Sequence, residues 1–277
     1  MERGGLDPIL GELTFIGLGL FDELGISLRG LEEAKKADYV YAELYTSLMG
    51  GLSIESLQNL IGKEVHVVDR RLMEDESGEP ILEKAEESRV VLLVPGDPLI
   101  ATTHIDLRLR AERRGIRTRV VHAASILSAA TGLSGLQNYR FGRNVTIPFP
   151  EPGFVYETPY EVIRENRGRD LHTLCFLDIR VEEGRFMTVK EGLEALLKVE
   201  EEKKLGVVTP RSLAVGVARV GSDNAVVKAD YVERLMGYNF GPPPHTLIIP
   251  AGRLHFVEAE ALITLAGAPA EIREMVT

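Results

Sequence analysis

The chain has 277 residues, of which 44% are hydrophobic and 27% are charged, as is typical of a globular protein with one large or two modest domains. Its net charge of −10 argues against a nucleic-acid-binding surface, because neutralising phosphates requires a basic face. Cys175 is the single cysteine, which excludes intrachain disulfides and cysteine-rich metal sites. We therefore expect a reducing, cytoplasmic compartment.

Membrane and metal association are not expected either. The opening residues lack the pattern of a signal peptide, and apolar runs such as residues 90–94 are too short to span a bilayer. The six histidines form no close pair with the spacing of metal ligands.

Apolar strands and helices alternate over the first 122 residues. We expect strands at 13–17, 39–44, 64–68, 89–96 and 116–122, and helices at 27–37, 53–62, 79–88 and 103–115. Ser27 is placed to cap the first helix, and Gly62 to end the second. Because the strands are nearly continuous apolar runs, the alternation predicts a mainly parallel sheet covered on both faces.

The second half begins with a break over residues 123–160, where small residues are followed by several prolines. Beyond it we expect strands at 170–180, 212–222 and 245–252, and helices at 188–204 and 254–267. Thr188 and Glu191 match a capping box. The predicted organisation is an N-terminal extension at 1–12, an α/β domain at 13–120 and a second α/β domain at 121–277.

The stretch "FIGLGLFDE", residues 15–23, resembles the opening of a dinucleotide-binding fingerprint. Gly17 and Gly19 fit its first two glycines, but Asp22 stands where the third is required. Asp22 and Glu23 would also repel a pyrophosphate. The nicotinamide-cofactor interpretation therefore lacks a physical basis, and a turn without any ligand remains an alternative.

Two further stretches are unusual. In "LLVPGDPLIATTH", residues 92–104, a buried strand ends in a turn made rigid by Pro95 and Pro98, and Asp97 could cap the following helix. In "HAASILSAATGLSG", residues 122–135, small side chains would allow the backbone to approach either a packed helix or a flat ligand.

Taken in order, these stretches resemble the tetrapyrrole-methylase class of S-adenosylmethionine-dependent methyltransferases, and within it the diphthine synthase family. The resemblance rests on "FIGLGLFDELGISLRGLEEAKKADYVYAELYTS", "PGDPLIATTH", "HAASI", "HTLCFLDI" and "GPPPHTLIIPAGRLHFVEAE", and it runs from about Leu13 to the C-terminus. Corrin and ribosomal-RNA methylases share this fold, whereas "AELYTSLM" and "PPPHTLI" favour the diphthine synthases.

The resemblance implies two α/β domains with the methyl donor in the cleft between them, and a homodimer. It implies repeated methylation of the amino group of a 3-carboxy-3-aminopropyl-histidine on translation elongation factor 2, which gives diphthine. By position it implies donor contacts from Leu20, Asp97, Ile100, Ser125, Ile126, Leu177, Val220 and His245. Val220 departs from the expected alanine, but that contact should be made through the backbone.

Each of these residues also has a structural interpretation. The apolar ones would serve in a core, Ser125 as a helix cap and His245 as a hydrogen-bonded buried histidine. No catalytic residue is assigned, although Asp22, Glu23, Glu43 and Tyr45 could accept a proton. The arginines between 108 and 119 would form either a solvated helix face or a dock for an acidic protein surface. The competing functions are a corrin or RNA methylase, an NAD-binding oxidoreductase and a silent scaffold.

Overall fold

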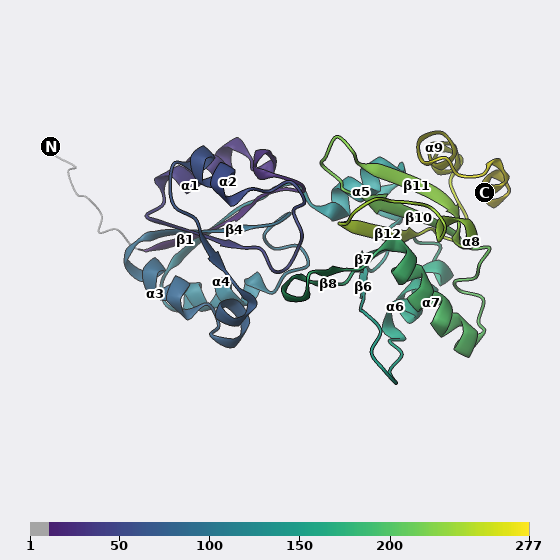
Figure 1. Ribbon diagram of the computed structural model, residues 1–277, viewed down its shortest axis with the longest axis horizontal. Coiled ribbons are helices and arrows are strands. Elements are labelled where there is room, and N and C mark those ends of the chain that lie inside the picture. Colours follow the sequence, from purple (N-terminus) through teal and green to yellow (C-terminus); the bar gives the residue numbers. More distant parts are fainter. Residues whose placement is uncertain (1–10, 277) are drawn as a thin grey trace. The chain divides into compact units, whose positions relative to one another are not determined.

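The computed structural model describes residues 11–276, which form two compact units that divide between Ser125 and Ile126 (Figure 1). Of the expected extension, residues 1–10 lie outside the described part of the chain. Glu12 already belongs to the first strand, one residue earlier than expected. In residues 11–276, no helix is long and apolar enough to cross a membrane.

Unit 1 alternates strands and helices as expected. Its elements are β1 (Glu12–Gly17), α1 (Leu28–Lys36), β2 (Tyr39–Glu43), α2 (Ile54–Ile61), β3 (His66–Val68), α3 (Glu79–Glu87), β4 (Arg89–Val94), α4 (His104–Arg113) and β5 (Arg117–Val121). The strands form one parallel sheet in the order β3-β2-β4-β1-β5. Short βα connections of this kind place all the strand carboxyl ends at one edge of the sheet.

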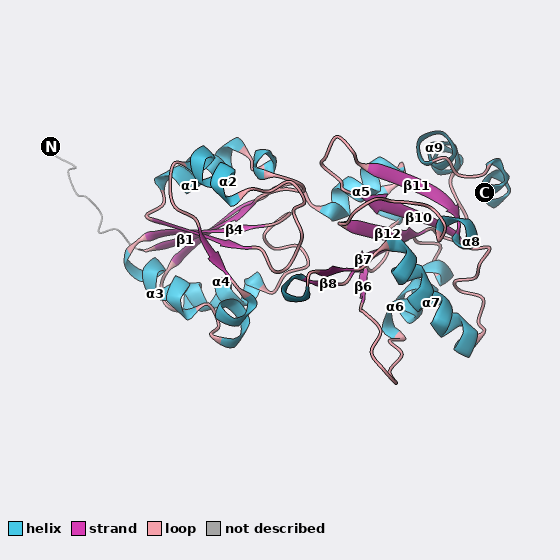
Figure 2. Cartoon of the chain, viewed as in Figure 1, coloured by secondary structure: helices cyan, strands magenta, loops and turns pink. Residues whose placement is uncertain are grey.

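Side-chain alternation along the strands gives unit 1 two cores. In β1, Ile16 packs with residues of α1 and α2, whereas Leu13 and Phe15 pack with residues of α3 and α4. Figure 2 shows these two helix pairs on opposite faces of the sheet. Both faces are therefore buried, which explains why the central strands are apolar at nearly every position.

Unit 2 has a different sheet. Its elements are α5 (Ile126–Ser134), β6 (Val145–Ile147), α6 (Thr158–Gly168), β7 (Thr173–Leu177), β8 (Ile179–Arg180), β9 (Arg185–Phe186), α7 (Val189–Lys203), β10 (Leu213–Ala218), β11 (Val226–Tyr231), α8 (Val232–Leu235), β12 (His245–Ile249) and α9 (Phe256–Ala266). The main sheet has the order β11-β10-β12-β7-β6, and only its β6–β7 pair is parallel. The fold is thus α/β with one parallel and one mixed sheet.

The expected break over residues 123–160 was wrong in part. It contains α5 and β6, and α6 begins at its end. Gly135, which directly follows α5, serves close packing, since a Cβ on it would lie 2.4 Å from that of Ala261 in α9. The edge strand β11 was missed because its alternating polar residues give only a weak signal.

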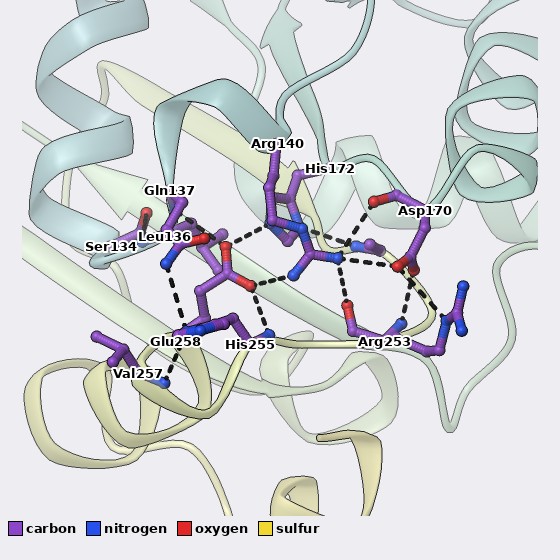
Figure 3. A network of polar contacts seen from close by, with 11 residues as sticks. Ser134, Leu136, Gln137, Arg140, Asp170, His172, Arg253, His255, Val257 and Glu258 are labelled. Atoms are coloured by element: carbon purple, nitrogen blue, oxygen red, sulfur yellow. Dashed lines mark hydrogen bonds and ion pairs between the residues drawn. The ribbon is translucent and has the colours of Figure 1, made fainter. Parts of the chain in front are cut away.

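A polar network around Glu258 connects distant segments of unit 2 (Figure 3). The Glu258 carboxylate accepts hydrogen bonds from His172 Nε2 at 2.9 Å, Arg140 Nη1 at 2.5 Å, and the backbone N–H groups of Gln137 and His255. Burial alone would raise the pKa of Glu258, but these hydrogen bonds outweigh burial and lower it to about 2. The network joins α9 to the start of β7 and to the segment after α5.

Candidate functional site

The glycine turn after β1 is held against the turn after β4. Gly19, which has a φ of 80°, exchanges two backbone hydrogen bonds with Gly96, of 3.2 and 2.6 Å. A Cβ on Gly17 would lie 2.4 Å from Gly96 O and 2.6 Å from the Cβ of Ala123. Because these glycines lack a side chain, the turn after β1, the turn after β4 and the segment after β5 can pack closely together at the end of β1.

Asp97 occupies the centre of this closure. Its side chain is only 6% exposed; Oδ1 accepts from the N–H of Leu99 at 3.2 Å, and Oδ2 lies 2.7 Å from Nδ1 of His122. The first contact is a local turn and not the helix cap that the sequence suggested, because α4 begins only at His104, with Thr103 in the N-cap position. The second contact was not foreseen, and it joins the turn after β4 to the residue that follows β5.

The other residues predicted in unit 1 gather at the same edge of the sheet. Leu20 is half-buried and follows the Gly19–Gly96 bridge, whereas Ile100 is 40% exposed in the turn after β4. Ser125 is buried four residues after β5 ends. The carboxyl edge of a parallel sheet is where open α/β folds bind ligands. The structure therefore brings Leu20, Asp97, Ile100 and Ser125 to the edge of the sheet at which such folds bind ligands.

The residues predicted in unit 2 share one edge of the second sheet, apart from Ile126, which begins α5. Leu177 ends β7, His245 begins β12, and Val220 follows the end of β10. Because β12 runs antiparallel to both β7 and β10, these three positions meet at the same side. All three side chains are at most 9% exposed.

His245 has the geometry of a structural histidine. Its Nδ1 accepts from the N–H of Val189, the first residue of α7, at 3.3 Å, so Nε2 carries the proton and donates to Gly241 O at 3.2 Å. Burial lowers the pKa of His245, which keeps the ring neutral. Both ring nitrogens are engaged within unit 2, as in the structural interpretation of this residue.

A buried carboxyl–imidazole pair at the end of β2 was missed. Glu43 and His104 are 0% and 1% exposed, and Glu43 Oε1 lies 3.6 Å from His104 Nε2. Burial raises the pKa of Glu43 to about 7 and lowers that of His104, so both groups favour their neutral forms. Thr46 Oγ1 donates to Glu43, and His104 Nδ1 donates to Pro98 O. The pair thus connects the segment after β2 to the Asp97 turn.

The two acidic residues of the glycine turn also serve local structure. Asp22 accepts from the N–H of Leu24 and caps a 3-10 turn, Glu23–Gly25. Glu23 Oε2 lies 3.5 Å from the N–H of Ser53, at the start of α2. These contacts give both carboxylates a local role in the fold.

Four of the six arginines between 108 and 119 are paired with nearby carboxylates, and a fifth, Arg108, bonds a threonine hydroxyl. The contacts are Arg108 with Thr118, Arg110 with Asp106, Arg114 with Glu79 and Glu86, Arg117 with Glu12, and Arg119 with Glu12 and Glu33. A polar cavity of about 300 Å³ lies among Glu12, Glu33, Arg89 and Arg119, at the amino edge of the sheet. These features favour a solvated, ion-paired surface over a strongly basic dock.

Comparisons with known proteins agree with the architecture. The family model of tetrapyrrole (corrin/porphyrin) methylases matches residues 12–229. A diphthine synthase of Methanosarcina mazei is 52% identical over 268 residues, covering 95% of this chain and 98% of that relative. A diphthine synthase of Methanothermobacter thermautotrophicus is 47% identical over 262 residues, again covering 95% and 98%.

A solved crystal structure of a diphthine synthase superposes with a TM-score of 0.87 at 43% identity, covering 96% of this chain and all of that one. The resemblance found in the sequence motifs is thereby confirmed, together with the α/β fold class. The chain belongs to the tetrapyrrole methylase family and, within it, to the diphthine synthases.

Proposed function

We propose that this chain uses S-adenosylmethionine to methylate the amino group of 3-carboxy-3-aminopropyl-histidine on translation elongation factor 2. The observation that carries the proposal is the 52% identity to a diphthine synthase over 95% of the chain. The proposal is also supported by the two hydrogen-bonded turns at Gly19 and Gly96, beside which Asp97 lies. We further propose that the enzyme acts in the cytoplasm as a homodimer.

The carboxyl edge of unit 1 fits such a methyl donor. Gly96 borders open space, because a Cβ built on it would meet no atom within 4 Å. Leu20 and Ile100 offer partly exposed apolar surface beside it, which suits a flat adenine ring. Since both carboxylate oxygens of Asp97 are engaged, we expect the Asp97 turn to bind the donor through its backbone.

For unit 2 we propose that Ile126, Leu177, Val220 and His245 complete the donor site by backbone and apolar contacts. When bound, the donor supplies a methyl group activated by a positively charged sulfur. The chain must align the substrate nitrogen with that methyl group and exclude water, which can lower the barrier by about 7–11 kcal/mol. His245 contributes by fixing the start of α7 relative to β12.

The decisive test combines the chain, the donor and elongation factor 2 that carries the unmethylated intermediate. Mass spectrometry should find added methyl groups on the modified histidine. A corrin and ribosomal RNA, offered separately, should not be methylated. Absence of methylation on elongation factor 2 would reject the proposal, and methylation of either alternative substrate would replace it.

Calorimetry tests the donor site independently of transfer. The chain should bind S-adenosylmethionine and its demethylated product, but not NAD. Asp97→Ala should weaken donor binding by loosening the turn after β4. If the affinity of this variant stayed within about twofold of the original, Asp97 would have only a structural role in the turn after β4.

A further inference from the structure

Asp97 and His122 form a dyad across the carboxyl edge of unit 1. Asp97 lies three residues beyond β4, and His122 directly follows β5. These strands are not neighbours, because β1 lies between them in the sheet. The contact of 2.7 Å between Asp97 Oδ2 and His122 Nδ1 therefore spans the end of β1, above Gly17.

The dyad fixes the protonation pattern of the imidazole. A carboxylate only accepts hydrogen bonds, so Nδ1 of His122 carries the hydrogen that meets Asp97. Asp97 cannot turn away easily, since it is buried and its other oxygen is bound by Leu99 N–H. In the neutral ring the lone pair then lies on Nε2. This is the orientation that a buried carboxylate gives to a histidine acting as a base.

The exposure of the ring distinguishes His122 from the other five histidines, all of which lie in the described part of the chain. His122 is 71% exposed although its carboxylate partner is 6% exposed. His172 and His245 use both ring nitrogens inside unit 2, and His104 is fully buried. Only His122 combines a buried carboxylate on one nitrogen with access to solvent at the ring.

The electrostatic surroundings of His122 are simple within unit 1. Asp97 is the charged side chain in contact with it among the described residues of this unit. On β5 itself, Arg117 and Arg119 are paired with Glu12 near the opposite end of the strand. The ring is therefore governed chiefly by one buried carboxylate.

We propose that His122, oriented by Asp97, is the general base that deprotonates the substrate amine before each methyl transfer, an inference that rests on the proposed function. Nε2 of His122 takes one proton from the substrate ammonium. The freed lone pair forms the N–C bond to the methyl carbon as the C–S bond of the donor breaks, and the electron pair of that bond stays on sulfur. The exposed imidazolium then returns the proton to solvent, which readies it for another round.

The test compares His122→Ala with the original chain in single-turnover methylation of the modified elongation factor 2. General-base catalysis contributes about 10²–10⁴-fold, so the variant should be at least about 100-fold slower. Added free imidazole should restore part of the rate of His122→Ala. Donor affinity, measured by calorimetry, should change little.

His66→Ala is the matched control, because His66 is a solvent-accessible histidine beside Glu64 on β3, away from the proposed site. It should leave the rate unchanged. A readout without donor or substrate is the side-chain ¹⁵N spectrum of the original chain, in which neutral His122 should carry its hydrogen on Nδ1. Asp97→Asn should remove that preference.

The outcomes distinguish a failure of the proposed function from a failure of the role proposed for His122. If the original chain transfers no methyl group, the proposed function fails and the role of His122 falls with it. If the original chain is active and His122→Ala is equally fast, only the inference about His122 is overturned. A slow variant that imidazole cannot rescue, and that has lost donor affinity, would also overturn it.

Discussion

Replacing Glu43 by glutamine tests how the buried pair at the end of β2 is protonated. Burial raises the pKa of Glu43 from 4.5 to about 7, so the folded chain holds this proton more tightly than the unfolded chain. Its ionisation therefore costs stability progressively as pH rises from 4.5 to about 7. Since each unit of pKa corresponds to about 1.4 kcal/mol, the full cost above pH 7 is about 3 kcal/mol.

Glu43→Gln keeps the shape of the side chain but cannot ionise, so the variant should escape this cost. Relative to the original chain, its free energy of unfolding should increase by about 2–3 kcal/mol between about pH 5 and pH 8. Urea unfolding followed by circular dichroism at the two pH values measures this difference. Glu83→Gln, at an exposed position of α3, is the matched control and should show no such trend.

A loss of stability in Glu43→Gln at high pH would show that the buried pair is charged. If Glu43→Gln were less stable than the original chain at high pH, the native pair would be a carboxylate bound to an imidazolium. Removing one partner of a buried ion pair destabilises strongly, because a charge is left without compensation. That outcome would refute the assignment of neutral forms to both Glu43 and His104.

Gly17→Ala should lower the free energy of unfolding by about 3 kcal/mol, because the new Cβ would overlap Gly96 O. The control is Gly132→Ala in α5, where a Cβ meets open space, and it should not destabilise the chain in the same urea experiment. Glu258→Gln should cost about 3 kcal/mol at neutral pH, since the pKa of Glu258 is lowered to about 2. This loss should shrink as pH falls from 4.5 towards 2 in acid titrations of unfolding. Reversing the charges of Arg110 and Arg113 should leave methyl-transfer rates unchanged, whereas a large drop would make that helix face a dock.

The elements that could be predicted from the sequence are those fixed by neighbouring residues. Ser27 caps α1 by accepting from Gly30 N–H, and Gly62 ends α2 in the left-handed conformation, both as expected. Thr188 and Glu191 form the expected capping box at the start of α7. Each signal lies within one turn of chain, so periodicity and capping rules are sufficient to find it.

The missed elements depend on distant partners. The small residues of α5 gave no helical stripe, and Gly135, which directly follows this helix, packs closely against Ala261 in α9, far away in the sequence. In the sequence, Gly17 matches the first glycine of a dinucleotide-binding fingerprint, whereas the structure shows Gly96 and Ala123 closing over it. A sequence shows that a position must be small, but the segment that fills the space is known only once the chain has folded.

Among residues 11–276, three carboxyl–imidazole pairs with a buried carboxylate show why residue identity alone could not locate the chemistry. Glu258 with His172 is wholly buried and saturated by further donors, so it serves to fasten unit 2. Glu43 with His104 is equally buried but lacks those donors, so it tends to neutrality and responds to pH. Asp97 with His122 buries the carboxylate and leaves the ring in solvent. The same two chemical groups thus form a structural contact, a titrating pair and a candidate base. Burial and the remaining hydrogen-bond partners determine which of these roles a pair takes.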